Sequence, residues 1–216
     1  MQRSLWLAGL AFMAFFPEVT SPQTPIILVD PVRAQLAAMG KPGATIALAR
    51  DKVSEIFQSE NSCSAWFKKA DPDAAATFAS LRFVIDAKGP QYIVGWRSDL
   101  GVRMFKHPYS ASTVEGSGAR SVVTLNANGP FFVRSGFVQW EESGNFRHAI
   151  GWGVFYVGSY EGNTLAAQMT TLLHEFGHVV GRIPEDTDEL SGQSGRNTQE
   201  VVHYCHAQIK AAERHF

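Results

Sequence analysis

The sequence predicts a single α+β domain, because helix-type and strand-type patterns alternate with clear turn signals along the chain. Short apolar runs separated by glycine-containing turns predict strands at residues 81–86, 91–96, 102–106, 121–126 and 131–138. Helical patterns are found at residues 47–58, 73–80 and 164–180, and a last helix is expected from residue 197. A segment rich in glycine and aromatic residues, 151–160, is a candidate for one more strand. We therefore expect a small mixed or antiparallel sheet packed on a helix, with a further helix at the C-terminus.

The helix at residues 164–180 has recognisable ends and one apolar face. Asn163 and Thr164 offer an N-cap. Gly181 stands where a helix can end in a left-handed turn, and Pro184 prevents its continuation. Apolar residues recur at spacings of three and four, at Leu165, Met169, Leu172, Phe176 and Val179. Gly177, inside the helix, costs about 1 kcal/mol relative to alanine, which suggests that another part of the chain approaches closely there.

Two histidines and a glutamate on this helix have the arrangement of a catalytic zinc site. His174 and His178 are four residues apart, so they lie on one helix face and can hold one Zn²⁺ per chain. Glu175 is then placed to take a proton from a zinc-bound water, whose pKa the metal lowers to roughly 7. The alternative is a surface helix that carries two histidines and a glutamate by chance.

The active-site helix of the zincin metalloproteases resembles the run His-Glu-Phe-Gly-His-Val-Val-Gly at residues 174–181. Gly181 matches the metzincin form of that helix, but the third metzincin histidine would fall at position 184, which is Pro184 here. A group of poorly characterised secreted bacterial zincin-like proteins is similar over the last third of the chain, at Ile183, Pro184, Glu185, Asp186, Ser191, Asn197, Val201 and Cys205. The resemblance implies a zincin-like fold, whose edge strand binds the backbone of a peptide or protein substrate.

Catalytic zinc sites use three protein ligands, so a third ligand must follow the two histidines. We predict Asp186, which comes just after the end of the motif helix; aspzincins use an aspartate, although at a different spacing. Glu185 and Asp188 are neighbouring candidates, and a solvated acidic loop is the alternative for all three. Glu200 is the other candidate, because gluzincins take a glutamate from a second helix. However, residues 197–200 predict a capping box in which Asn197 caps the last helix and Glu200 reaches back to it.

The resemblance also implies a residue on the last helix that stabilises the negatively charged oxygen of the transition state. His203 and Tyr204 are the candidates for that role, and a helix face without a role is the alternative.

The expected function is that of an exported zinc metallopeptidase. Two other functions stay open: an envelope or binding protein with a structural zinc, and a zinc amidase that acts on cell-wall material. Glu175 argues against the structural zinc, which would need four protein ligands and no adjacent base.

The first 21 residues predict a signal peptide. Arg3 is followed by an uncharged apolar run at residues 5–16, and Pro17 ends that run. The run is shorter than the ~20 residues that a membrane span requires, so the mature chain, residues 22–216, is expected to have no stable span. Cleavage is expected near Thr20 or Ser21, and the protein is expected to be secreted or periplasmic. An uncleaved anchor is the alternative.

The chain contains two cysteines, Cys63 and Cys205, and an exported protein with two cysteines is expected to join them in a disulfide. A thiolate zinc ligand from Cys205 is the alternative.

Composition excludes other classes of partner: 19 basic and 20 acidic residues give a formal net charge of −1, so neither nucleic acid nor an anionic membrane is an expected partner. The length suffices for one sizeable core.

Overall fold

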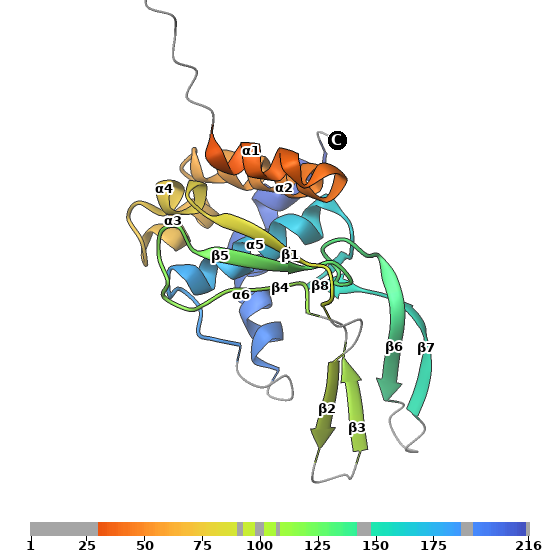
Figure 1. The fold of residues 1–216 in the computed structure, drawn as a ribbon. Helices are drawn as coiled ribbons and strands as arrows, with labels where there is room; N and C mark the ends of the chain where they lie inside the picture. The colour runs from red at the N-terminus through yellow and green to blue at the C-terminus, as the bar shows by residue number, and fades with distance from the viewer. Residues whose placement is uncertain are drawn as a thin grey trace, which may run out of the picture.

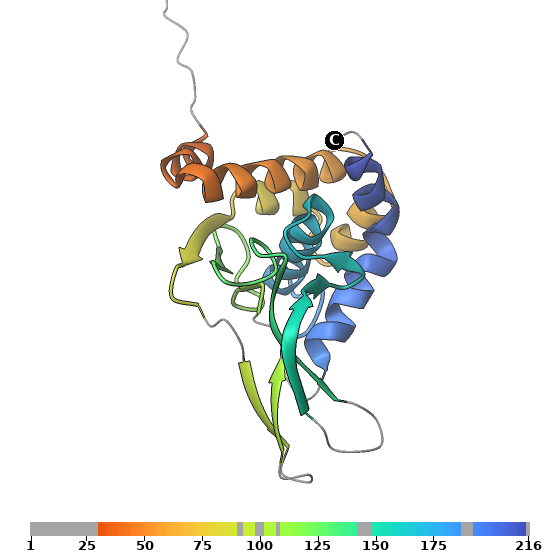
Figure 2. The same ribbon diagram turned by 90° about the vertical axis from the view of Figure 1, so that its right-hand side faces the viewer.

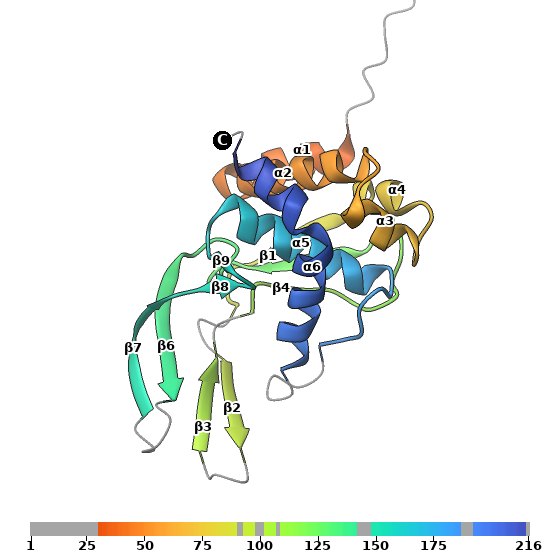
Figure 3. The ribbon, with the colours of Figure 1, turned by 180° about the vertical axis from the view of Figure 1, so that it is seen from behind.

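The centre of the fold is helix α5 (Leu165–Val179), which is buried along nearly its whole length. A small sheet lies on one side of α5 and helix α6 (Gln193–Glu213) lies on the other (Figure 1, Figure 3). Helix α2 (Gly40–Phe57) crosses above them and also packs on α5. The fold is therefore mixed α/β, with helices and small sheets arranged around one buried helix.

The structure, a computed structural model, describes residues 30–89, 93–97, 102–106, 109–141, 148–186 and 192–214. The predicted signal peptide, residues 1–21, lies outside the described residues, as does the predicted alternative ligand Asp188. Within the described part of the chain, no helix combines the length and the apolar character needed to cross a membrane.

The helices before the sheet begin where the sequence supplies caps. Helix α1 (Pro31–Ala38) starts at Asp30, whose carboxylate accepts hydrogen bonds from two backbone N–H groups of the first turn. Gly40, at φ +64°, lets the chain pass directly into α2, which begins seven residues before the predicted start at residue 47. Helix α3 (Ser62–Lys68) has a capping box formed by Asn61 and Ser64. Sequence analysis missed α1 and α3, while α4 (Ala74–Ala79) lies within its predicted range.

The sheet beside α5 has three strands in the order β1-β5-β4. Strands β1 (Arg82–Asp86) and β5 (Val122–Asn126) are parallel, whereas β4 (Ala111–Ser112) is antiparallel to β5, so the sheet is mixed. Phe83, Val123 and Leu125 point into the core, because successive side chains of a strand face opposite sides of the sheet. Strand β4 forms an edge of the sheet and contacts α5.

Two hairpins project from the same end of the molecule (Figure 2). They are β2 (Ile93–Arg97) with β3 (Val102–Lys106), and β6 (Ser135–Glu141) with β7 (His148–Val154). A short pair, β8 (Tyr156–Val157) with β9 (Tyr160–Glu161), leads into α5. The predicted strand 131–138 begins only at Ser135, because residues 129–134 form turns. The predicted strand 151–160 is broken at Phe155, whose ring is buried.

Four aromatic rings hold α5 against the helices that precede the sheet. Phe176 lies inside the motif, and its ring packs on those of Phe57, Phe67 and Phe78 at centroid distances of 5.3, 5.1 and 5.3 Å. Aromatic pairs at these separations stabilise a core beyond the area that they bury. The motif helix is therefore anchored by aromatic contacts with α2, α3 and α4.

The predicted disulfide between Cys63 and Cys205 is confirmed. It joins α3 to α6 across a sequence separation of 142 residues, and both cysteines are fully buried. Trp66 of α3 stacks on Tyr204 of α6 beside the bridge, with ring centroids 5.0 Å apart. Since Cys205 is paired, it does not supply the thiolate that was the alternative.

We expect the double variant Cys63→Ala/Cys205→Ala to lose roughly 2–5 kcal/mol of unfolding free energy, because the bridge closes a long loop in the unfolded chain. Urea unfolding monitored by circular dichroism measures the difference from the wild type. As a control, mass spectrometry of the unreduced wild type after alkylation should find no modified cysteine. Two alkylated cysteines in folded wild-type protein would contradict the bridge.

Candidate metal centre

The motif helix α5 carries both histidines into the interior on one face. Its predicted bounds are confirmed: Thr164 is the N-cap, and its hydroxyl accepts a hydrogen bond from Ala167 N–H at 3.2 Å. His174 is 5% exposed and His178 is 4% exposed, so both side chains are buried. The two Nε2 atoms lie 3.0 Å apart and face the same point.

The end of α5 is closed by two separate chain segments. Gly181 takes φ +64°, as expected, and its N–H donates to His178 O at 2.9 Å. Gly116 and Gly118, in the loop between β4 and β5, donate their N–H groups to His178 O and Val179 O at 2.8 and 3.0 Å. The last carbonyls of the helix are thereby satisfied without water.

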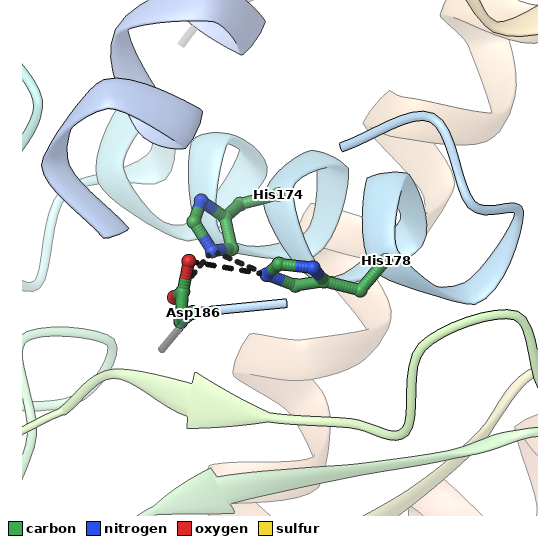
Figure 4. A group of neighbouring side chains, drawn as sticks. All are labelled: His174, His178 and Asp186. Carbon is green, nitrogen blue, oxygen red and sulfur yellow. Dashed lines mark hydrogen bonds and ion pairs between the residues drawn. The ribbon is translucent and has the colours of Figure 1, made fainter. Parts of the chain in front are cut away.

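The turn after α5 brings Asp186 back to the two histidines (Figure 4). Its Oδ2 lies 3.1 Å from His174 Nε2, and its Oδ1 lies 3.5 Å from His178 Nε2. One nitrogen from each histidine and one oxygen from Asp186 all lie within 4.8 Å of one another, so this group can hold a metal ion. The structure thus brings together the three residues that sequence analysis assigned to the metal.

Two adjacent residues of α6 hold this group in place. The Asn197 amide donates to Asp186 Oδ1 at 2.7 Å and to Pro184 O at 2.8 Å. Thr198 Oγ1 lies 3.0 Å from His174 Nδ1. The predicted capping box at residues 197–200 is wrong, because α6 begins four residues earlier, after Gly192 at φ +69°. Asn197 is therefore inside the helix, and its side chain is free to reach the Asp186 turn.

The charges of the group suit a cation. Burial lowers the pKa of His174, and His178 lowers it further, while Asp186 opposes the change. Burial raises the pKa of Asp186, but hydrogen bonds with His174, His178 and Ser194 outweigh it and hold that pKa far below its usual value. The group therefore combines a neutral imidazole with a carboxylate, which is a typical set of metal ligands.

Glu175 is buried beside the group without a hydrogen bond to its second oxygen. Its side chain is 4% exposed, and its Oε2 has no partner among the described residues. Burial, together with the charge of Asp186, raises its pKa to about 8. Buried polar atoms are nearly always paired, so an unpaired carboxylate oxygen is a frequent sign of a functional site.

A cleft of about 1040 Å³ opens over the group. Glu175, His178 and Asp186 lie at its base, and its walls come from strand β4, strand β8 and helix α6. His203 lines the α6 wall, whereas Tyr204 faces away from the cleft and stacks on Trp66. The structure therefore brings His203, and not Tyr204, to the open side of the site.

Of the other candidates for the third ligand, the two that the structure describes, Glu185 and Glu200, are not in the group. Glu200 is exposed on α6 and does not line the cleft, and Glu185 lines the cleft with its backbone N–H bonded to Glu115 Oε2 at 3.0 Å. The hydrogen bonds of Asn197 and Thr198 were not predicted, because nothing in the local sequence pattern distinguishes these two residues from other helix residues.

Comparison with family models, with characterised proteins and with solved structures found no match to this chain.

The close approach expected at Gly177 leads to a stability prediction. A Cβ added there would lie 2.9 Å from two side-chain atoms of Ile183, whereas a Cβ at Gly195 on α6 would meet nothing within 4 Å. Both changes gain helix propensity, so their difference isolates the overpacking. We expect Gly177→Ala to be roughly 1–3 kcal/mol less stable than Gly195→Ala in urea unfolding. Equal stability of the two variants would show that the turn after α5 yields freely.

The geometry also predicts that Asp186, and not Glu200, is the acidic residue required for metal binding. Asp186→Ala should weaken Zn²⁺ binding severely, because it removes one of the three converging donors. Glu200→Ala removes an exposed carboxylate outside the group, so its zinc affinity should equal that of the wild type. Competition titration against a chromophoric chelator measures both. Loss of zinc in Glu200→Ala with full retention in Asp186→Ala would reverse the assignment.

Proposed function

We propose that this protein is a zinc-dependent metallopeptidase that is exported and hydrolyses peptide bonds. The observation that carries the proposal is one arrangement at the base of the cleft. Three metal-binding side chains converge there, and the buried carboxylate of Glu175 lies beside them with an oxygen that has no partner among the described residues. A metal site alone does not need such a carboxylate, whereas hydrolysis requires a base.

The donor set fits zinc. Two imidazole nitrogens and one carboxylate oxygen form a ligand set that catalytic zinc sites use, with a fourth position left for water or substrate. His174, His178 and Asp186 supply that set, and two of the three, His178 and Asp186, line the cleft, from which water or substrate can approach. Neutral imidazole is the form that binds a metal, and burial favours that form of His174.

When bound, zinc would act as a Lewis acid on the substrate carbonyl and would lower the pKa of water. Glu175 takes a proton from the attacking water and returns it to the leaving amine, so one carboxylate serves first as base and then as acid. Its pKa is about 8 from burial and the charge of Asp186 alone, and beside a bound Zn²⁺ that pKa would fall toward neutral pH, where a group can both accept and donate a proton. His203, on the α6 wall, can donate a hydrogen bond to the developing oxyanion.

Strand β4 supports a peptide as the substrate. Ala111 and Ser112 pair with β5 along one edge, and both residues line the cleft. An extended peptide can add to such an edge by backbone hydrogen bonds, which recognise any peptide sequence. A mixed sheet whose edge strand lies beside the motif helix is also the arrangement expected of a zincin-like fold. The buried disulfide agrees with an exported protein, because such bridges persist in oxidising compartments.

The test of the base is Glu175→Gln, with Glu185→Gln as a matched control. Both glutamates line the cleft, but only Glu175 is buried beside the metal-binding group. We expect Glu175→Gln to keep close to one zinc per chain and to lose about 10²–10⁴-fold in turnover of an unbiased peptide library. Glu185→Gln should keep both zinc and most of the activity.

Three results would contradict the proposal. Zinc retained without peptide cleavage by the wild type would favour a structural metal. Cleavage of cell-wall peptides alone, with the unbiased library untouched, would favour the amidase. An unchanged rate in Glu175→Gln would remove Glu175 from the mechanism.

A further inference from the structure

We infer that Asn197 and Thr198, in the second turn of α6, are positioning residues for two of the three metal-binding side chains. They are adjacent in sequence, 1% and 8% exposed, and each contacts a different member of the group. The inference rests on the proposed metal-dependent function and adds to it the residues that hold His174 and Asp186 in place.

Thr198 orients the imidazole of His174. A neutral imidazole carries one N–H, so only one of its two nitrogens can offer a lone pair to a metal. Thr198 Oγ1 lies 3.0 Å from His174 Nδ1 and is placed to accept the Nδ1–H when Nε2, which faces His178 Nε2 and Asp186 Oδ2, gives its lone pair to a metal. Metal-binding histidines are commonly oriented by such a bond from the second ring nitrogen.

Asn197 orients the carboxylate of Asp186 through a hydrogen bond. Its Nδ2 has two hydrogens, and these bind Asp186 Oδ1 at 2.7 Å and Pro184 O at 2.8 Å. Neither oxygen can donate, so the orientation of the amide follows from the chemistry of its partners. Its own Oδ1 accepts from Gln193 Nε2 at 2.8 Å. Asn197 binds Oδ1 of Asp186, whereas Oδ2 faces His174 Nε2 at 3.1 Å, so Oδ2 is the oxygen better placed for a metal that His174 also holds.

Helix α6 is rigid enough for this role. Val201, Cys205 and Ile209 are fully buried along its inner face, and Cys205 is bonded to Cys63 of α3. The helical turn that carries Asn197 and Thr198 is therefore held in place by core packing and by a covalent link. Positioning of ligands to within a fraction of an ångström needs support of this kind.

The experiment compares Thr198→Val, Thr198→Ser and Asn197→Leu with two control variants, Thr77→Val and Asn126→Leu. Thr77 is a buried threonine on α4, and Asn126 is a fully buried asparagine whose amide bonds to Tyr109 O at 3.1 Å. Neither control residue belongs to the metal-binding group. Zn²⁺ affinity is measured by chelator competition, ligand geometry by the absorption spectrum of the Co²⁺-substituted protein, and stability by thermal unfolding of the metal-free form.

We expect Thr198→Val and Asn197→Leu to bind Zn²⁺ about 10–100-fold more weakly than the wild type, with altered Co²⁺ bands. Thr198→Ser keeps the hydroxyl and should retain affinity close to that of the wild type. The controls should lose stability and keep their affinity. If Asn197→Leu does not fold, the comparison of valine and serine at position 198 decides the question.

A merely structural role gives a different result: the metal-free Tm falls while Zn²⁺ affinity and the Co²⁺ spectrum stay unchanged. That outcome, with a wild type that binds zinc, overturns this inference and leaves the proposed function standing. A wild type that binds no zinc overturns the proposed function, and this inference with it.

Discussion

The structure depends on one constraint, which is that a fully buried helix carries three titratable side chains. His174, Glu175 and His178 lie on α5, and each of the three is at most 5% exposed. Buried polar groups are costly unless they are paired, and a buried charge is more costly still. The fold meets this constraint by bringing Asp186 and α6 to the two imidazoles and by opening a cleft over the carboxylate. The same contacts therefore build the metal-binding group and offset the burial of the titratable side chains of α5.

Helix α5 is held by two sets of contacts, and each has a consequence for the site. Phe176 packs on rings from α2, α3 and α4, which fixes the depth and rotation of the helix. Helix α6 packs through its buried residues Val201, Cys205 and Ile209 and adds hydrogen bonds to the site through Asn197 and Thr198. The disulfide joins α3 to α6 and so links these two sets of contacts. The ligand geometry is thereby tied to the core.

Strand β4 and the loop after it serve the open side of the site in three ways. Strand β4 lies along one wall, and the loop that follows it caps α5 through Gly116 and Gly118. Glu115 of the same loop accepts the backbone N–H of Glu185, next to Asp186. One short segment thus lines the cleft, closes the motif helix and steadies the turn that carries the third metal-binding side chain. A peptide lying along β4 would contact the segment that holds this turn.

The sequence by itself determined the features that depend on local spacing. These are the bounds of α5, the shared face of His174 and His178, the left-handed turn at Gly181 and, with only two cysteines in a chain expected to be exported, the disulfide. The predicted strands at 81–86, 91–96, 102–106 and 121–126 also lie within two residues of β1, β2, β3 and β5. Each of these follows from short-range sterics, from periodicity or from elimination, and none requires knowledge of which segments meet.

Only the tertiary structure decided the features that depend on contacts between distant segments. The pattern at residues 197–200 is compatible with a cap, yet Asn197 is inside α6, because its best hydrogen-bond acceptors are provided by the Asp186 turn. The same contact brings Asp186 into the metal-binding group and leaves Glu200 exposed. Likewise, His203 and Tyr204 are neighbours in sequence, but the ring of Trp66 holds Tyr204 on the side of α6 away from the cleft. A local pattern shows what a residue can do, whereas its partner is selected by the packing free energy of the whole chain.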